Sequence, residues 1–152
     1  MKTTRRYGKK TDLALTLWVK LARAYATFGR RTIDDIRGYG LTQAQFGVVE
    51  SLGHLGEITL GDLSRKMLSS CGNITVVVDN LEKEGLVQRR HCTEDRRVIY
   101  VRLSAKGRKH FNAIFARHAR CIASLASVLT EEEQEHLGAL LKKLGTAVAA
   151  LP

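Results

Sequence analysis

Hydrophobic residues return at helical spacing along most of the chain. Between about Asp12 and Arg37 they recur every three or four positions, as Trp18, Leu21, Tyr25 and Phe28. Side chains at this spacing line one face of a helix, and the run Gly38-Tyr39-Gly40 ends it. The pattern therefore predicts a long first helix with an aromatic face.

Two shorter helices are predicted next. Thr42 and Gln45 form a capping box, in which Thr42 caps the helix and Gln45 reaches back to it. The apolar face of this second helix is Phe46, Val49 and Leu52. The segment 58–60 is too short to predict a strand. Thr59 can instead cap a third helix. The buried side of the third helix is Leu63 and Met67.

A fourth helix, from Gly72 to Glu84, is well marked. Its apolar positions fall at i, i+3, i+4 and i+7, and they are Ile74, Val77, Val78 and Leu81. Residues 76–78 alone favour a strand, but Gly85 at the C′ position supports the helix. The segments 86–90 and 98–103 then predict a β-hairpin with a long charged tip.

Two further helices follow the hairpin. Ser104 caps the fifth, whose apolar positions are Phe111, Ile114, Phe115, Ile122, Leu125 and Leu129. A capping box at Thr130 and Glu133 opens the last helix. Its apolar stripe has coiled-coil-like spacing and consists of Leu137, Leu141, Leu144 and Val148. We expect that the chain itself does not fully cover this stripe.

The composition excludes several classes of protein. The 152 residues fit a single domain, and an apolar fraction of 44% excludes wholesale disorder. No apolar run is long enough for a membrane span, and no apolar stretch follows the basic start, so no secretory signal is expected. The three cysteines lack C-x-x-C spacing, which argues against a disulfide framework or a zinc ribbon and for a reducing compartment.

Positive charge is concentrated in two segments. The formal net charge is +10, and residues 83–109 carry nine positive and three negative charges. Residues 1–10 carry five positive charges and no negative one, which is typical of a solvated arm. A charge of this size attracts nucleic acid or an anionic membrane. The second segment covers the predicted hairpin, so its structural setting favours nucleic acid.

The order of the predicted elements is that of a winged helix-turn-helix. The second helix of such a pair buries one face and offers the other to the major groove of DNA. The outward face of 72–84 consists of Asn73, Val76, Asn80 and Lys83, with Thr75 alongside it. Asparagine can bind adenine bidentately, and a valine methyl can touch the methyl of thymine. Ser69, Ser70 and the amides near Gly72 lie where a helix N-terminus meets a phosphate.

The tip of the hairpin carries Asp95, Arg96 and Arg97. An arginine on a projecting wing can enter a narrow minor groove, where the negative potential is enhanced. Asp95 cannot favour DNA directly, so we expect it to orient Arg97 through an ion pair. The alternative is a surface salt bridge that contributes little to stability.

Segment 41–107 resembles the MarR family of bacterial transcription regulators. The matching stretches are 41–49, Asp79-Asn80-Leu81-Glu82-Lys83-Glu84-Gly85-Leu86-Val87-Gln88-Arg89, Asp95-Arg96-Arg97 and 101–107. The resemblance implies a mostly α fold with a small β-wing, in one chain of residues 1–152. It implies a winged helix-turn-helix domain at 41–104 between dimerisation helices at 11–37 and 105–150.

The resemblance also implies how the protein works. It implies a cytoplasmic, nucleoid-associated homodimer that represses transcription from pseudo-palindromic operators in double-stranded DNA. A phenolic or lipophilic acid would release it from DNA. Carried over by position, Arg97 would be the minor-groove arginine and Asp95 its partner. The residues that would face the DNA are Ser69, Ser70, Asn73, Thr75, Val76 and Asn80. No catalytic residue, cofactor, metal or membrane is expected.

Candidate effector and sensor residues have ordinary structural explanations. Trp18, Tyr25, Phe28, Phe46 and Phe115 could line an effector crevice, but at helical spacing we expect them to be core residues. His54 and His118 could contact a carboxylate ligand, although a partly buried, hydrogen-bonded histidine is the commoner arrangement. Cys71 lies just before the recognition helix, where the helix dipole can make a thiol reactive, but we expect it to be a small turn residue that does not react.

Three alternatives remain open at this point. A redox-sensing regulator of the same fold would use Cys71. An architectural protein would bind DNA through charge alone, with little preference for sequence. An enzyme is disfavoured, because the chain has no G-x-S-x-G, H-E-x-x-H or P-loop motif.

Overall fold

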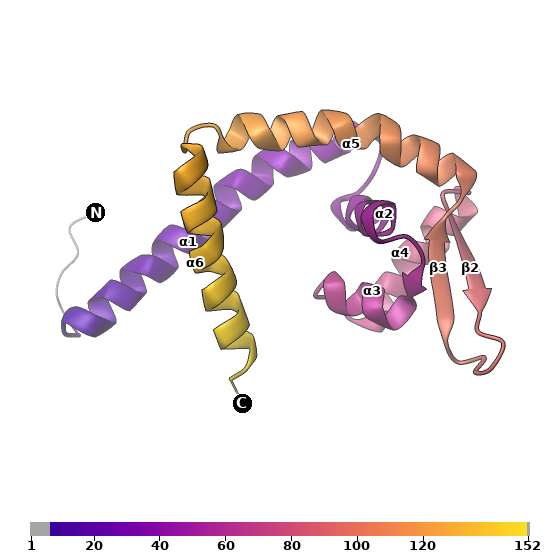
Figure 1. Ribbon diagram of the computed structural model, residues 1–152, viewed down its shortest axis with the longest axis horizontal. Coiled ribbons are helices and arrows are strands. Elements are labelled where there is room, and N and C mark those ends of the chain that lie inside the picture. The colour runs from indigo at the N-terminus through magenta and orange to yellow at the C-terminus, as the bar shows by residue number, and fades with distance from the viewer. Residues whose placement is uncertain (1–6, 152) are drawn as a thin grey trace. The chain divides into compact units, whose positions relative to one another are not determined.

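A computed structural model of the protein describes residues 7–151. The chain forms two compact units, one ending at His118 and the other beginning at Ala119. The elements, in chain order, are α1 (Lys9–Arg37), α2 (Gln43–Leu55), β1 (Ile58–Thr59), α3 (Leu60–Lys66), α4 (Cys71–Lys83), β2 (Val87–His91), β3 (Ile99–Leu103), α5 (Ala105–Ala126) and α6 (Glu131–Ala149) (Figure 1). The predicted fold class, mostly α with a small β-wing, is confirmed.

The two capping boxes predicted for the second and the last helix are confirmed, whereas the first helix begins at Lys9, earlier than the predicted Asp12, and has no side-chain cap. In α2 the amide of Gln45 donates to the Thr42 hydroxyl at 3.2 Å, and the Thr42 amide donates to the Gln45 side chain at 2.9 Å. Thr130 and Glu133 form the same reciprocal pair at the start of α6. Each box satisfies backbone donors that a helix N-terminus leaves without an intrahelical partner.

The hydrophobic core of the first unit lies between α2, α3, α4 and the small sheet. Its fully buried side chains are Val48, Val49, Leu52, Leu63, Ile74, Val78, Leu81, Val87 and Val101. The apolar faces predicted for the second, third and fourth helices supply most of this set. Met67 and Val77 are only partly buried and pack against the core from its edge. Burial of this surface is the main term that stabilises the unit.

The sheet has three antiparallel strands in the order β1-β3-β2. β2 and β3 form the predicted hairpin, in which Val87 faces Leu103 and His91 faces Ile99. β1 is a strand of two residues, too short to be predicted from the sequence, and its Ile58 pairs with Val101. Its partner lies more than forty residues away in sequence, so no local pattern could reveal the pairing.

The expectation that all five aromatic residues are core residues is wrong for three of them. Phe46 is buried and Phe115 packs against the core, as expected. Trp18, Tyr25 and Phe28 of α1 are 65%, 75% and 39% exposed. Within the first unit, α1 contributes Ile36, close to its C-terminal end, to the core. The aromatic face of α1 therefore lies on the surface of this chain.

The second unit ends in α6, none of whose residues is buried. Its predicted stripe is exposed along its length, and the most covered member, Leu144, is still 38% exposed. Contiguous exposed leucines are unusual on a monomeric protein surface. Over residues 7–151, no helix combines the length and hydrophobicity that crossing a bilayer requires.

Candidate nucleic-acid interface

The candidate recognition helix, α4, begins at Cys71, one residue before the predicted start. Ser70 is its N-cap, and the Ser70 hydroxyl accepts a hydrogen bond from the Asn73 amide at 3.3 Å. Gly85 adopts a φ of 73° just after the helix, which confirms its C′ position. Glycine enters this left-handed region without a steric penalty, so the chain can turn directly into β2.

α4 has the two faces that the sequence predicted. The face toward the core buries Ile74, Val78 and Leu81. The opposite face exposes Asn73, Val76 and Asn80, and Val76 is 59% exposed although it is apolar. Lys83 is exposed at the end of the same face. In Figure 1, α4 lies beside the β2–β3 hairpin.

The residues predicted to meet phosphate lie around the start of α4. Ser70 and Gly72 are exposed, and Ser69 is half-buried with its amide bonded to the Ser64 carbonyl at 3.1 Å. Thr75 also departs from a fully outward position. It is half-buried, and its hydroxyl donates to the Cys71 carbonyl at 2.8 Å. Thr75 therefore lies at the border of the exposed face.

The tip of the wing has the predicted ion pair. The Arg97 amide and Nε donate to Oδ1 of Asp95 at 3.0 and 3.1 Å, and Nη2 donates to Oδ2 at 3.2 Å. These bonds, first from the Arg97 side chain and then from its amide, lower the pKa of the Asp95 carboxyl. The Arg97 side chain is 92% exposed, so its charge is held in place but remains accessible. Arg96 is exposed beside it.

A second ion pair fixes the wing nearer its base, and sequence reasoning missed it. Arg90 of β2 donates to Oε2 of Glu57 at 2.7 Å, and its guanidinium lies 4.6 Å from the centre of the Tyr100 ring. The hydrogen bond from Arg90 lowers the pKa of the Glu57 carboxyl. Glu57 directly precedes β1, so the pair joins the two outer strands of the sheet across β3.

Arg89 joins the wing to α4, and it too was missed. Its Nη1 lies 2.5 Å from Oδ1 of Asp79 and 2.9 Å from Oε2 of Glu82. Its Nη2 donates to the Thr75 carbonyl at 3.1 Å. The sequence shows these charges but gives no sign that one guanidinium reaches three positions of the helix.

The turn between α3 and α4 has a feature that the sequence did not suggest. Leu68 has a φ of 48°, a left-handed conformation that side chains with a Cβ rarely adopt. Its side chain is 95% exposed. Strained residues of this kind concentrate at functional sites, and this one lies two residues before the cap of α4.

Known proteins share both the sequence and this arrangement. The sequence model of the MarR family matches residues 41–99, from before α2 to the start of β3. The HTH-type transcriptional regulator MhqR of Bacillus subtilis (strain 168) is 38% identical over 135 residues, which cover 89% of this chain and 93% of MhqR. The chain belongs to the MarR family.

The chain is also similar to a second transcriptional regulator and to a protein of known structure. The HTH-type transcriptional repressor MdtR of Bacillus subtilis (strain 168) is 31% identical over 76% of this chain and 74% of MdtR. A solved structure of BpsR of Bordetella bronchiseptica, whose DNA binding is regulated by 6-hydroxynicotinic acid, aligns with a TM-score of 0.77 and 25% identity. The alignment covers 86% of this chain and 98% of BpsR. This MarR-family protein is thus a DNA-binding transcriptional regulator.

Its cysteines differ in their surroundings. Cys71 is exposed as the first residue of α4. Cys92 is half-buried directly after β2, and hydrogen bonds from the amides of Asp95 and Glu94 lower the pKa of its thiol. Within residues 7–151, no cluster of three or more histidine, cysteine or acidic side chains has a geometry that could hold a metal ion.

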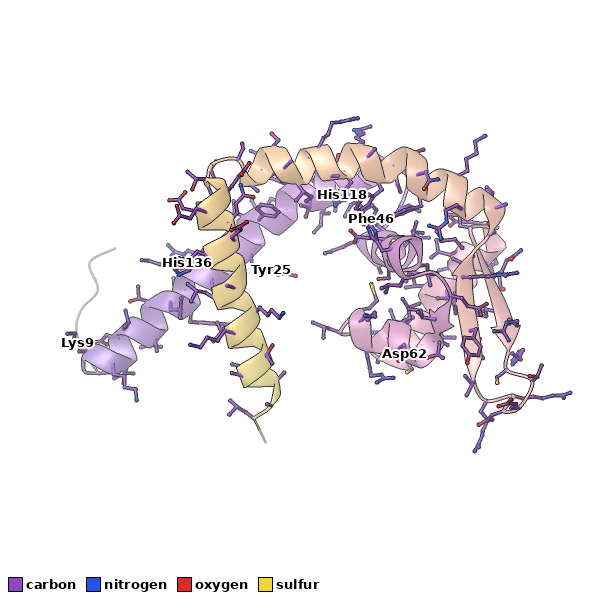
Figure 2. All side chains as sticks on the ribbon, viewed as in Figure 1. Lys9, Tyr25, Phe46, Asp62, His118 and His136 are labelled. Carbon is purple, nitrogen blue, oxygen red and sulfur yellow. The ribbon has the colours of Figure 1, made fainter. Side chains whose placement is uncertain are left out.

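The two candidate effector histidines of this MarR-family protein make contacts within the chain. His118 is buried, and its ring lies 4.5 Å from that of Phe46, centre to centre (Figure 2). Nδ1 of His118 lies 3.0 Å from Oδ2 of Asp35. His54 is exposed and meets the edges of Phe111 and Phe115. His118 therefore has the buried, hydrogen-bonded arrangement expected for both histidines, whereas the expectation is wrong for His54, which is exposed.

An open groove lies between α1 and the start of α2 in the first unit. Its volume is about 400 Å³, and its lining is Tyr25, Ala26, Gly29, Arg30, Ile33, Asp34, Arg37 and Gln43. Two guanidinium groups thus flank an aromatic and an aliphatic side chain. The Arg37 guanidinium is only loosely paired, at 3.5 Å from Asp34.

Proposed function

We propose that this MarR-family protein is a homodimeric repressor that reads a pseudo-palindromic operator and that a small aromatic or lipophilic acid releases. One observation carries the proposal: the exposed face of α4 lies next to an arginine-tipped wing whose Arg97 is oriented by Asp95. A helix for the major groove and a cation for the adjoining minor groove form one continuous DNA-reading surface.

The base contacts are assigned to the exposed face of α4. Asn73 and Asn80 present amides that match the N6 and N7 edge of adenine, and Val76 presents methyl groups that match thymine. Thr75 contributes from the border of the face. An exposed valine between two asparagines has no role in the core, which favours a role in an interface.

The positioning contacts are assigned to the ends of this surface. Ser69, Ser70 and the amide of Gly72 would bind phosphate at the positive end of α4. Arg96 and Arg97 would enter the minor groove, with Asp95 holding the Arg97 side chain. Contacts to phosphate fix the register of a protein on DNA, whereas contacts to bases specify the sequence.

Dimerisation is assigned to the outer helices, at 11–37 and 105–150, with 41–104 as the DNA-binding segment. In support, α1 exposes Trp18 and Leu13, and α6 exposes Leu137, Leu141 and Leu144. Such apolar surface is commonly covered in a stable oligomer. A two-fold dimer would place two recognition helices about 34 Å apart, one helical turn of DNA.

The effector is assigned to the groove between α1 and α2. Arg30 and Arg37 supply positive charge for a carboxylate, and Tyr25 and Ile33 supply contact surface for a ring. A volume of about 400 Å³ is within the range of small-molecule sites. In support, the DNA binding of BpsR is regulated by 6-hydroxynicotinic acid, a hydroxylated aromatic acid, and MdtR is a repressor.

The test is DNA binding measured by fluorescence anisotropy at physiological salt. The probe is a labelled duplex from the region upstream of the protein's own gene, with scrambled duplex as competitor. We expect scrambled DNA not to displace the probe and 6-hydroxynicotinic acid to release it. If scrambled DNA displaces the probe as well as the probe sequence itself does, binding sites are selected from a random DNA pool. A regulator of distant genes selects a defined sequence, whereas an architectural protein selects none.

The dimer is tested separately, by sedimentation equilibrium. Leu141→Glu places a charge within the exposed stripe of α6, and Lys142→Glu changes the neighbouring position. We expect Leu141→Glu to yield monomers and Lys142→Glu to remain dimeric. A monomeric wild-type protein would contradict the dimer while leaving the DNA-binding surface in place.

A redox-sensing function is the second candidate, because Cys71 is exposed at the first position of α4. Oxidation at this position would bring a larger, charged group onto the DNA-facing end of the helix. In this case peroxide lowers operator affinity, and Cys71→Ser abolishes the loss. An equal response of both proteins to peroxide excludes Cys71 as the sensor.

A further inference from the structure

Arg89 makes a set of contacts that fixes α4 against the wing. Its backbone amide donates to Oε1 of Glu82 at 3.2 Å, and its Nη1 reaches Glu82 and Asp79 at 2.9 and 2.5 Å. Its Nη2 bonds to the main-chain carbonyl of Thr75 at 3.1 Å. The Arg89 side chain is only 19% exposed. A single residue of β2 thus holds three successive turns of the candidate recognition helix.

The positions that Arg89 contacts form a stripe of their own. Thr75, Asp79 and Glu82 follow the i, i+4, i+7 spacing of one helix face. At about 100° per residue, this stripe is turned by about 100° from the buried one. The buried stripe consists of Ile74, Val78 and Leu81. Hydrophobic packing alone tolerates some rotation of a helix about its axis, whereas a second set of directional contacts on another face removes that freedom.

We propose that Arg89 is a positioning residue for DNA recognition. It sets the rotation of α4 about its axis and couples that rotation to the wing. The exposed stripe of Asn73, Val76 and Asn80 is thereby aimed at the bases while the wing tip is aimed at the adjoining groove. This inference rests on the sequence-specific binding proposed above. It requires that discrimination between sequences depend on Arg89 more strongly than affinity for DNA in general.

The chemistry of the contacts requires arginine. A planar guanidinium can bond at once to two carboxylates and a carbonyl, whereas an ammonium group is a single point charge. Its charge also offsets Asp79 and Glu82, which lie on the helix that approaches the phosphates. The Nε group is buried and, within the described residues, has no hydrogen-bond partner. The fork formed by Nη1 and Nη2 therefore carries the side-chain contacts of Arg89 with α4.

The decisive variant is Arg89→Lys, because it keeps the charge and removes the fork. Arg102→Lys is the matched control: Arg102 is exposed on β3, the other strand of the wing. Affinities are measured for two duplexes, an operator selected from a random pool by the wild-type protein and its scrambled counterpart. Thermal unfolding followed by circular dichroism reports whether each variant is folded.

We expect Arg89→Lys to reduce the ratio of operator affinity to scrambled affinity by about tenfold, a typical effect of one misaligned base contact. The Arg89→Lys protein should keep its affinity for the scrambled duplex and remain folded at the assay temperature. The Arg102→Lys protein should keep the wild-type ratio of operator affinity to scrambled-duplex affinity. An unchanged ratio, or an equal loss for both duplexes, overturns the inference. If the wild-type protein itself shows no preference, the proposed function fails instead, and the two failures are distinguishable.

A second variant covers the case in which Arg89→Lys does not fold. Asp79→Asn removes one carboxylate from the fork, and the half-exposed Asp79 side chain leaves room for the amide. We expect the ratio of operator affinity to scrambled-duplex affinity to fall by less than in Arg89→Lys, because Glu82 and the Thr75 carbonyl still hold Arg89. A folded Asp79→Asn protein with the wild-type ratio overturns the inference.

Discussion

His118 of α5 donates a hydrogen bond from Nδ1 to Oδ2 of Asp35 near the end of α1, over 3.0 Å. The same carboxylate accepts a hydrogen bond from the Tyr39 hydroxyl and lies 3.8 Å from Nε of Arg117. Asp35 and His118 are eighty-three residues apart in sequence, and both side chains are largely shielded from solvent. Within the first unit, this pair joins the first helix to the one that leaves the wing.

The Asp35 contacts predict a pH-dependent contribution to stability. Burial raises the pKa of this carboxyl, but the hydrogen bonds from Tyr39 and His118 and the charges of His118 and Arg117 together lower it below 3.8. A carboxyl whose pKa is lower in the folded state stabilises that state above its unfolded pKa. The contribution is lost as the pH falls through the folded pKa.

We therefore expect Asp35→Asn to lower the free energy of unfolding at pH 7 by about 1–2 kcal/mol, as for a charge-assisted hydrogen bond. The difference from the wild-type protein should shrink below about pH 4, where the unfolded carboxyl is protonated. Urea unfolding at pH 7 and at pH 3 measures both. A difference that does not change with pH would mean that packing, and not charge, is what Asp35 contributes.

Arg97→Ala is expected to weaken DNA binding without affecting the fold. The Arg97 side chain is 92% exposed, so its removal exposes no core. Operator affinity should fall about tenfold, equivalent to about 1.4 kcal/mol. The slope of log affinity against log salt concentration should become shallower by about one, because one cation no longer contacts the DNA. Anisotropy titrations at several salt concentrations give both quantities.

The matched control for Arg97→Ala is Lys142→Ala, which removes the same charge from the exposed surface of α6, at a position where substitution is expected to leave the dimer intact. Both variants should unfold at the wild-type temperature. If the two lower the affinity equally, the effect is one of net charge, and Arg97 is not part of the DNA contact surface.

Local patterns predicted most of the helices well, because these elements are specified locally. The buried stripe of α4 and the caps at Thr42 and Thr130 can be read within a few residues of each other. β1 could not be predicted, because its two residues are a strand only when β3 lies beside them. The same holds for Arg89 and for Asp35, whose partners come from other elements.

The aromatic face of α1 shows a different limit of sequence reasoning. Periodicity identifies which residues share a face, but it does not say what covers that face. Trp18 and Tyr25 follow the helical period as a core residue would, yet both are exposed in this chain. A stripe that packs against a partner molecule and one that packs within the chain have the same pattern.

Leu68 predicts a substitution that increases stability. Its φ of 48° costs roughly 1–2 kcal/mol for a residue with a Cβ, and glycine removes this cost. Glycine also loses more entropy on folding, about 0.5–1 kcal/mol. We expect Leu68→Gly to raise the free energy of unfolding by about 0.5–1 kcal/mol in urea titrations.

The control for Leu68→Gly is Leu68→Ala, which removes the same exposed side chain but keeps the Cβ. Because Leu68 is 95% exposed, alanine should leave the free energy of unfolding close to the wild-type value. If both substitutions stabilise equally, the gain comes from removing an exposed leucine, and the backbone conformation is not the cause.

The last prediction concerns the wing thiol. The amides of Asp95 and Glu94 donate hydrogen bonds that lower the pKa of the Cys92 thiol. Partial burial opposes this shift, and the charge of Arg90 adds to it. Because the thiolate is the reactive form, the alkylation rate should rise with pH to a midpoint below that of a cysteine in an unstructured peptide. The midpoint is the test, since burial slows the absolute rate at every pH.

Iodoacetamide labelling of a Cys71→Ser, Cys121→Ser protein isolates this thiol, and mass spectrometry follows its modification over pH. Arg90→Gln in the same background should move the midpoint upward only slightly, because the two amides remain. A midpoint at or above that of the peptide cysteine, labelled under the same conditions, would mean that the amides of the turn do not hold the thiolate in solution. The turn between β2 and β3 would then have another conformation, and the Asp95–Arg97 pair would have to be measured in that conformation instead.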